Sequence, residues 1–150
     1  MEDEKYMREA IKEAEIAANE GEVPVGAVVV WKGEIVSRAH NIKEQTKDAT
    51  NHAEMVALRR AVEKLGHWRY LQEATMYVTV EPCPMCAGAM IQTRLGRLVY
   101  GTVEPKSGAV VSTINLLQDP RFNHWVEVVG GVLEEECREL MQQFFRRLRE

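Results

Sequence analysis

The chain has 150 residues, of which 45% are hydrophobic and 28% are charged, and its net charge is −4. This size and composition are typical of one soluble globular domain and exclude a low-complexity or disordered chain. No apolar run approaches the ~18–20 residues of a membrane span, and the acidic N-terminus "MEDEKYMREA" lacks the apolar segment of a signal peptide. We therefore expect a cytoplasmic protein with no membrane partner.

The first third of the chain predicts an amphipathic helix followed by a hairpin. Apolar residues recur at helical spacing over 4–19, and Gly21 and Pro24 end that pattern. The stretch "VGAVVVWKGEIVSRAHN" predicts two strands joined by a tight turn at residues 32–33. Its first strand is apolar on both faces, as expected of a strand covered by helices on two sides. Residues 42–51 are polar and are expected to form a loop.

Helices and strands alternate in the rest of the chain. In chain order we expect a helix at 52–66, a strand at 74–80, a helix at 83–95, a strand at 97–103, a short helix at 112–118, a strand at 125–131 and a helix at 133–149. The residues expected to face the core are Met55, Leu58, Val62 and Leu65 in the helix at 52–66, and Leu133, Cys137, Leu140, Met141, Phe144 and Leu148 in the last helix.

The order of these elements predicts the fold class. Strands that alternate with helices favour a three-layer α/β/α sandwich, here with a mixed five-stranded sheet that contains the hairpin. The segment before the last strand is long enough for a crossover, so the last two strands can be parallel. No repeat or linker is visible, and residues 1–150 are expected to form a single domain.

Two cysteines in "PCPMC", Cys83 and Cys86, begin the helix that follows the strand at 74–80. Three cysteines and no export signal argue against a disulfide framework. A structural zinc site normally has four ligands, and the third cysteine, Cys137, is expected to be a small core residue. A redox-active pair remains an alternative.

A histidine in "NHAEM", His52, begins another of the predicted helices. Because residues i and i+3 of a first helical turn share a face, Cys83 and Cys86 converge with His52 if the two helix starts are neighbours. Three ligands with an open fourth position are the pattern of a catalytic zinc site, and helix N-termini favour thiolates. Glu54, two residues after His52, can then carry protons between a zinc-activated water and a substrate.

The combination of "HAE" at 52–54 with "PCPMC" at 82–86 resembles the zinc nucleobase-deaminase signature H-x-E…P-C-x-x-C. The segments that extend this resemblance to the bacterial tRNA-specific adenosine deaminase family are "EVPVGAVVV" (22–30), "HAEMVALR" (52–59), "YVTVEPCPMCAGAMI" (77–91) and "FFRRLR" (144–149). The resemblance implies a cytidine-deaminase-like fold and hydrolytic deamination of the wobble adenosine of a tRNA anticodon to inosine.

The same resemblance implies roles for individual residues. One zinc ion per subunit would be held by His52, Cys83 and Cys86, and Glu54 would be the catalytic proton carrier. The substrate-binding positions that it implies are Val23, Asn41, Ala53, Glu104 and Lys106.

Among these positions, Asn41 would hydrogen-bond the purine, Val23 would form an apolar wall and Ala53 would contribute its backbone. Glu104 lies in "EPKSG", where the family usually has aspartate. The expected partners are the tRNA anticodon loop and a second copy of the chain, in a homodimer whose subunits complete each other's sites.

Other functions stay open on the sequence alone. A deaminase of a free base or nucleoside, of the guanine or cytosine type, shares the zinc signature. A non-catalytic zinc-stabilised RNA-binding module and a thiol redox protein are rivals from other classes. The arginines at the end of the last helix, Arg146, Arg147 and Arg149, either complement the helix dipole or contact the tRNA backbone.

Overall fold

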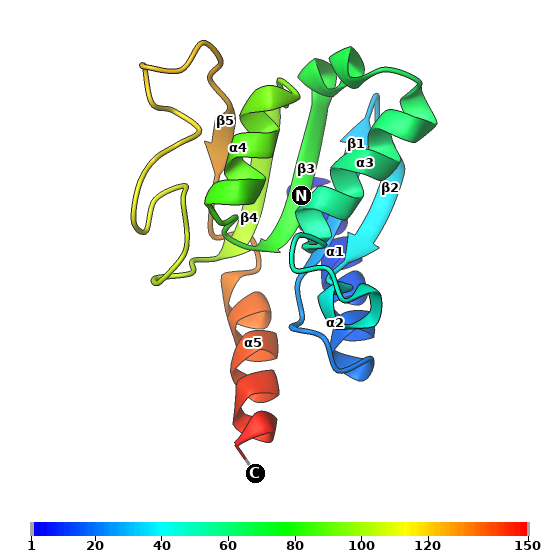
Figure 1. Cartoon of the computed structure of the whole chain (residues 1–150), viewed down its shortest axis with the longest axis vertical. Coiled ribbons are helices and arrows are strands. Elements are labelled where there is room, and N and C mark those ends of the chain that lie inside the picture. The colour runs from blue at the N-terminus through cyan, green and yellow to red at the C-terminus, as the bar shows by residue number, and fades with distance from the viewer. Residues whose placement is uncertain (1, 150) are drawn as a thin grey trace.

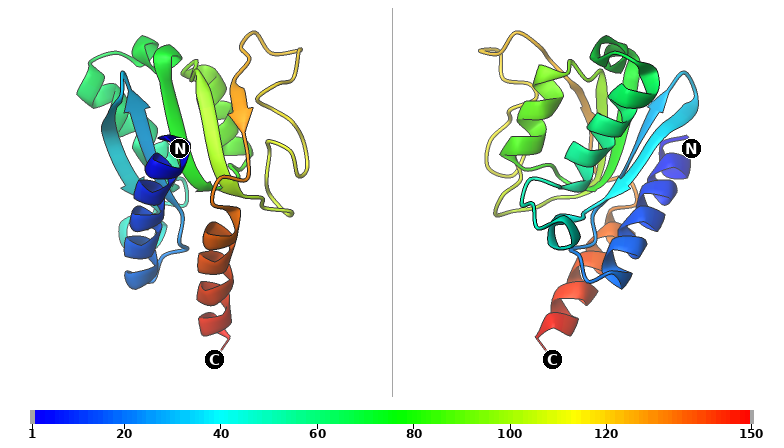
Figure 2. Two further views of the ribbon diagram at one scale, coloured as in Figure 1. Left: turned by 180° about the vertical axis from the view of Figure 1, so that it is seen from behind. Right: turned by 45° about the vertical axis from the view of Figure 1, so that its right-hand side comes forward.

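The computed structural model describes residues 2–149, which form one five-stranded sheet with helices on both faces (Figure 1, Figure 2). In chain order the elements are α1 (Glu2–Asn19), β1 (Gly26–Trp31), β2 (Glu34–His40), α2 (Lys43–Thr46), α3 (Ala53–Leu65), the 3-10 helix η1 (Trp68–Glu73), β3 (Ala74–Val80), α4 (Pro84–Gln92), β4 (Arg97–Thr102), β5 (Glu127–Val129) and α5 (Glu134–Leu148). The predicted three-layer α/β/α sandwich is confirmed. Within these residues, every helix is too short or too polar to span a bilayer.

The sheet has the strand order β2-β1-β3-β4-β5 and is mixed, as expected. Strand β1 is antiparallel to both of its neighbours, whereas β3, β4 and β5 are mutually parallel. The hairpin turn has left-handed backbone angles at Lys32 (φ 50°) and Gly33 (φ 77°), as in a type I′ turn, which suits the twist of two paired strands.

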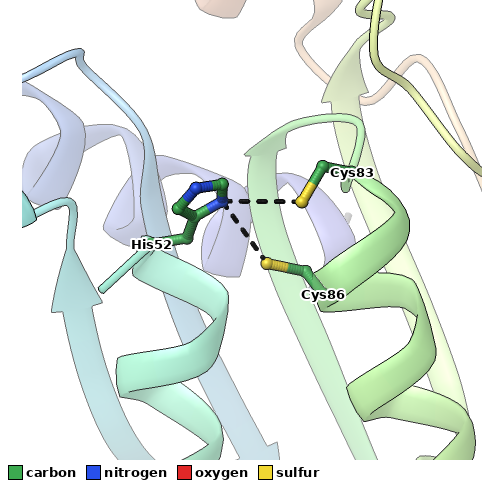
Figure 3. Close-up of side chains that lie close together, drawn as sticks. All are labelled: His52, Cys83 and Cys86. Atoms are coloured by element: carbon green, nitrogen blue, oxygen red, sulfur yellow. Dashed lines mark hydrogen bonds between the residues drawn. The ribbon is translucent and has the colours of Figure 1, made fainter. Parts of the chain in front are cut away.

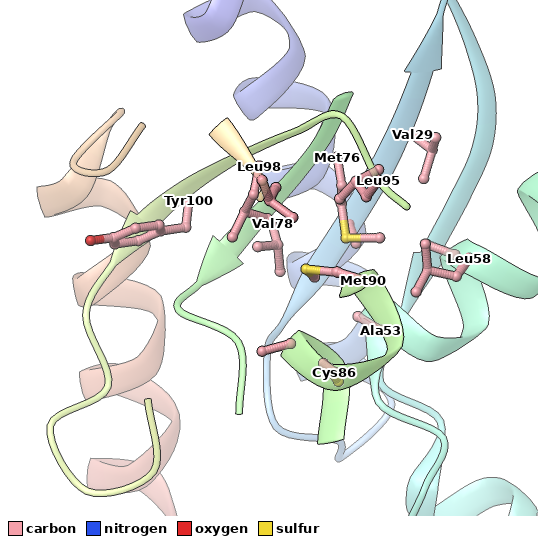
Figure 4. Close-up of a cluster of buried hydrophobic side chains, with 14 of the residues drawn as sticks. Val29, Ala53, Leu58, Met76, Val78, Cys86, Met90, Leu95, Leu98 and Tyr100 are labelled. Carbon is pink, nitrogen blue, oxygen red and sulfur yellow. The ribbon is translucent and has the colours of Figure 1, made fainter. Parts of the chain in front are cut away.

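Alternating side chains of the strands build a core on each face of the sheet. Val29 and Met76 belong to the core under α3 and α4 (Figure 4), whereas Val28 and Tyr77 point to the core under α1 and α5. Cys137 of α5 lies in the second core and is 1% exposed, which confirms its prediction as a core residue. The apolar strand β1 is thus covered on both faces.

One end of the sheet gathers segments that are far apart in the sequence. Strands β2 and β3 both run antiparallel to β1, so they end at the edge where β1 begins. Strand β4 is parallel to β3 and ends there too. The segments at Val23, Asn41, Cys83 and Glu104 therefore meet at this edge, where α3 and α4 also begin.

The helix predicted at 112–118 is wrong, because the chain between β4 and β5 consists of turns. The backbone N–H groups of Val110, Val111 and Ser112 are bound to the carboxylate of Glu81, and that of Thr113 is bound to the carbonyl of Gly108. These contacts hold the backbone in a non-helical path that local sequence cannot reveal. The strand predicted at 125–131 is also shorter in the structure, where β5 covers only Glu127–Val129.

The polar loop predicted at 42–51 contains one turn of helix, α2. Its N-terminal N–H groups, those of Glu44 and Gln45, donate to the buried carboxylate of Glu22 at 3.1 and 2.9 Å. A cap supplied from about twenty residues away satisfies the free donors of a helix start, but it leaves no local pattern in the sequence.

The buried face of α3 is only partly the predicted one. Leu58 is buried as expected, but Met55, Val62 and Leu65 are half-buried. The fully buried positions are the small ones, Ala53, Ala57 and Ala61. Small side chains let α3 lie close to β2, and the larger ones are displaced to the side of the helix.

Helix α5 follows its predicted stripe as far as Phe144 and departs from it in the last turn. Cys137 and Phe144 are buried, but Leu148 is 65% exposed, so its predicted inward orientation is wrong. The second half of α5 extends beyond the sheet (Figure 1), where no other element of residues 2–149 covers its last turn. Among the described residues, this half of the helix has one face toward the sheet edge at which α3 and α4 begin.

Candidate active site

His52, Cys83 and Cys86 meet at this edge of the sheet (Figure 3). Nδ1 of His52 lies 3.6 Å from Sγ of Cys83 and 3.6 Å from Sγ of Cys86. His52 is the N-cap of α3 and Cys83 is the N-cap of α4, with Cys86 in the first turn of α4. The structure therefore brings together the three side chains that the spacing of the sequence predicts as neighbours.

The chemistry and spacing of this group fit a zinc ion. Imidazole nitrogen and cysteine sulfur are the ligands that zinc prefers. Zinc–nitrogen and zinc–sulfur bonds of about 2.05 and 2.3 Å at a tetrahedral angle place nitrogen and sulfur about 3.6 Å apart. The three ligand atoms here all lie within 4.8 Å of one another, so one ion can reach them all.

The two cysteines differ in their readiness to lose a proton. The neighbouring Cys86 side chain, together with His52, lowers the pKa of the Cys83 thiol to about 4. Its partnership with Cys83, together with burial, raises the pKa of Cys86. The hydrogen bond to Cys83 raises the pKa of His52. The group thus presents a thiolate before any metal is bound.

Glu54 lies beside this group and lines the same pocket as His52 and Cys83. Its side chain is inside the protein, with 4% of the residue exposed. Burial raises the pKa of Glu54 to about 7. A carboxyl group with such a pKa can both accept and donate a proton near neutral pH.

The pocket has a volume of about 180 Å³, roughly six times the ~30 Å³ share of one water molecule. It is therefore a recess for an organic group rather than for solvent alone. Its walls combine apolar and polar side chains, as ligand sites commonly do. The residues that line it are Val23, Val25, Asn41, Lys43, His52, Glu54, Val80, Glu81, Cys83, Glu104, Ser107, Met141 and Phe145.

The predicted substrate-binding residues take different places around the pocket. Val23, Asn41 and Glu104 line it, whereas Ala53 and Lys106 do not. Nδ2 of Asn41 donates to the Val23 carbonyl at 3.1 Å, and Oδ1 accepts from the Ala53 N–H at 2.8 Å. Asn41 thereby links the other two residues, and Ala53 is connected to the pocket through it. Lys106 is exposed, and its N–H donates to Glu104 Oε1 at 3.0 Å.

Sequence reasoning did not single out several residues of the pocket wall, notably Lys43, Glu81, Ser107 and Phe145. Phe145 comes from α5 and lies off its predicted inward stripe, 40% exposed. A second depression continues from the pocket along α5. The residues that line it are Glu104, Met141, Gln142, Phe145, Arg146 and Arg149. Both depressions share Glu104, Met141 and Phe145, so α5 forms one side of the pocket entrance.

The chain is similar to known proteins over nearly its whole length. A family model described as MafB19-like deaminase matches residues 1–149. A tRNA-specific adenosine deaminase of Bacillus subtilis is 54% identical, over 98% of this chain and 91% of its own length. Another of that description, from Aquifex aeolicus, is 43% identical over 97% of this chain and 95% of its own.

The fold is similar to that of solved structures as well. One structure comes from a study of A-to-I editing by tRNA:A34 deaminases at the wobble position of transfer RNA. It matches with a TM-score of 0.87 and 41% identity, and the match covers 91% of this chain and 98% of that one. By sequence and by fold, this chain belongs to the family of the tRNA-specific adenosine deaminases.

Proposed function

We propose that this protein is a zinc-dependent hydrolase that converts the wobble adenosine (A34) of a tRNA anticodon to inosine. Residues 1–150 would act as one deaminase domain with one zinc ion per subunit. The observation that carries the proposal is the meeting of His52, Cys83 and Cys86 beside the buried Glu54. It occurs in a chain whose relatives are named tRNA-specific adenosine deaminases.

In this proposal His52, Cys83 and Cys86 hold the zinc ion. An ion bound there would supply a water whose pKa is lowered to about 7, as in other catalytic zinc sites. The two thiolates balance the charge of the ion, and the N-termini of α3 and α4 favour the thiolate form. Three protein ligands leave one position open, which is the arrangement that distinguishes a catalytic site from a structural one.

Glu54 is the proposed proton carrier. It would accept one proton from the attacking water and deliver it to a ring nitrogen of the base, and it would then carry a second proton, from the added hydroxyl group, to the departing amine. Its raised pKa, about 7, matches this double role because both of its protonation states are populated at neutral pH. The net reaction adds water to the base and releases ammonia.

Asn41 and Val23 are the proposed contacts of the base. Asn41 uses one amide hydrogen on Val23 and one oxygen lone pair on Ala53. Its second amide hydrogen and second lone pair are uncommitted within residues 2–149, so the group can still pair with a purine edge. The two contacts already made fix the orientation of the amide before a substrate enters.

The rim around Glu104 and the end of α5 are the proposed contacts of the RNA outside the target base. Phe145 offers an exposed aromatic face near the pocket, and Arg146 and Arg149 line the adjoining depression. Aromatic and arginine side chains together bind unstacked nucleotides, as in a single-stranded anticodon loop. Lys106, exposed beside Glu104, would add positive charge to this rim.

A homodimer is the proposed assembly, and the cytoplasm is the proposed location. An apolar groove runs between α3 and α4, the helices whose first turns carry the proposed ligands, and a second copy of the chain is its proposed occupant. The residues of this groove are Met55, Leu58, Arg59, Val62, Ala89 and Thr93. A reducing compartment would keep the cysteine ligands as thiols until they bind metal.

An inosine assay on a synthetic anticodon stem-loop tests this proposal, with bound zinc measured on the same samples. Wild type should form inosine and contain one zinc ion per chain. Glu54→Ala should keep the zinc and the fold but lose at least about 100-fold in kcat, because a general acid–base group contributes that much. Unchanged activity in Glu54→Ala, or activity on free guanine or cytosine but not on the stem-loop, would contradict it.

A further inference from the structure

Glu81 is a buried carboxylate that the proposed chemistry does not use. The residue follows β3, lines the pocket and is 3% exposed. Burying a carboxylate costs free energy of folding unless hydrogen-bond donors surround it. A buried carboxylate is therefore expected to accept several hydrogen bonds. The donors that reach Glu81 all come from one segment, residues 104–112, which we name the rim loop.

Five hydrogen bonds connect Glu81 to the rim loop. Oε1 accepts from the Glu104 N–H at 3.0 Å and from the Ser112 hydroxyl at 2.5 Å. Oε2 accepts from the N–H groups of Val110, Val111 and Ser112 at 3.0, 2.8 and 2.9 Å. One carboxylate thus holds both ends of a loop that has no helix or strand of its own.

The packing of the rim loop depends on the same carboxylate. Gly108 lies against it so closely that an added Cβ would overlap the Glu81 carboxyl group. Glu104, at one anchored end, and Ser107, between the two ends, line the pocket. The position of these two residues is therefore set by a side chain that follows a different strand.

We propose that Glu81 is a positioning residue that holds the rim loop against the pocket, so that Glu104 and Ser107 contact the RNA around the target base. This role rests on the proposed function, because it assigns the rim loop to substrate binding. Glu81 does not take part in the bond changes. Its loss should weaken substrate binding more than the chemical step.

The test compares Glu81→Gln with Arg94→Ala. Glutamine keeps the shape but places an N–H₂ group where the rim loop also offers donors, so at least one of the five bonds is lost, and three are lost if the N–H₂ group takes the place of Oε2. Arg94→Ala removes a contact to the far half of the same connection, since Arg94 binds the Asn123 carbonyl at 2.9 Å. The control variant therefore loosens the part of the β4–β5 connection that lies outside the rim loop.

Hydrogen exchange, zinc content and kinetics on the stem-loop give separate readouts. Glu81→Gln should speed amide exchange in 104–112 by at least about tenfold, because hydrogen bonds to a charged acceptor are worth more than a factor of ten. Zinc content should not change. KM should rise at least about tenfold while kcat stays within about threefold, which marks lost binding rather than lost chemistry. Arg94→Ala should leave all of these values unchanged.

Two further variants separate positioning from a general loss of structure. In Gly108→Ala the added Cβ overlaps the Glu81 carboxyl group and displaces the rim loop. This variant should therefore raise KM as Glu81→Gln does, although Glu81 itself is unchanged. The double variant Glu81→Gln/Glu104→Ala should have no higher KM than the worse of the two single variants. Glu81→Gln displaces the Glu104 side chain and Glu104→Ala removes it, so both substitutions lose the same contact.

Unchanged exchange in 104–112, or a fall in kcat that accompanies zinc loss, would overturn the proposal. So would additive effects in the double variant. If wild type forms no inosine, the proposed function fails, whereas the exchange comparison still decides whether Glu81 anchors the rim loop.

Discussion

The carboxyl group of Glu54, the proposed proton carrier, has a pKa that depends strongly on its surroundings. Burial raises its pKa from 4.5 to about 7, and the neighbouring Cys83 thiolate acts in the same direction. A group prepared in this way costs stability when it is ionised, because the folded protein disfavours its charged form. The raised pKa on which the proposed role of Glu54 depends should therefore be measurable in a folding experiment.

We predict that Glu54→Gln stabilises the metal-free protein at pH 8. The folded-state pKa is above the unfolded-state value, so the folded chain binds the proton more tightly and stability falls as pH rises from about 4.5 to 7. This difference of about 2.5 pKa units corresponds to about 3 kcal/mol at pH 8, and it should shrink toward zero at pH 5 and below. Urea unfolding of wild type and Glu54→Gln at pH 8 and pH 5 measures this stabilisation. An equal stabilisation at the two pH values would contradict the prediction.

Spacing in the sequence predicted that His52, Cys83 and Cys86 could share one site, but it did not predict the wall of the pocket. Cys83 and Cys86 are three apart at a helix start and share a face, and they meet His52 because the starts of α3 and α4 are neighbours, which only the structure shows. The contacts of Asn41 to Val23 and Ala53 join three separate segments. Such contacts depend on the finished fold and have no periodic pattern.

At the scale of elements, two buried glutamates explain where local prediction failed. Glu22 caps the short α2 inside a predicted loop, and Glu81 holds the rim loop in place of a predicted helix. In each case a carboxylate from another part of the chain satisfies backbone donors and overrides local propensity. Strand β3, in contrast, was predicted at its observed bounds, because its burial and its flanking turns are both visible in sequence.

Helix α5 offers a direct comparison between its two possible roles. Arg146 lines the depression beside the pocket, whereas Arg147 is exposed and lines neither that depression nor the pocket. If the arginines only complement the helix dipole, the two are equivalent. If the depression binds RNA, only Arg146 matters.

We predict that Arg146→Gln raises KM for the stem-loop several-fold and reduces the steepness of its salt dependence by up to about one counterion. Arg147→Gln makes the same change of charge one position away and should leave both quantities unchanged. Initial rates at a series of salt concentrations provide the measurement. Equal effects of the two substitutions would favour the dipole explanation.

At the scale of the whole molecule, strand direction creates the active-site edge. The mixed sheet places the ends of β2, β3 and β4 beside the start of β1, which brings together the segments at Val23, Asn41, Cys83 and Glu104. The order of elements in the sequence predicted the layers and the parallel pairing of the last strands. The matching solved structure shares this cytidine-deaminase-like arrangement, with a TM-score of 0.87.

We predict that Val62→Glu converts the proposed dimer to a monomer, because it places a charge in the apolar groove between α3 and α4. Ile16→Glu makes the same substitution at an exposed apolar residue of α1, outside the groove, and should leave the assembly intact. Sedimentation velocity at micromolar concentration distinguishes the two. A wild-type monomer, or a dimer that survives Val62→Glu, would remove the groove as the interface.

X-ray absorption at the zinc edge of the purified protein tests the proposed zinc site directly. We predict two sulfur neighbours at about 2.3 Å, one imidazole nitrogen at about 2.0 Å and one further light neighbour that the protein does not supply. Cys83→Ser should remove one of the two sulfurs from the spectrum. A fourth protein ligand, or a protein that binds no zinc while Cys83 and Cys86 form a disulfide, would contradict the central claim.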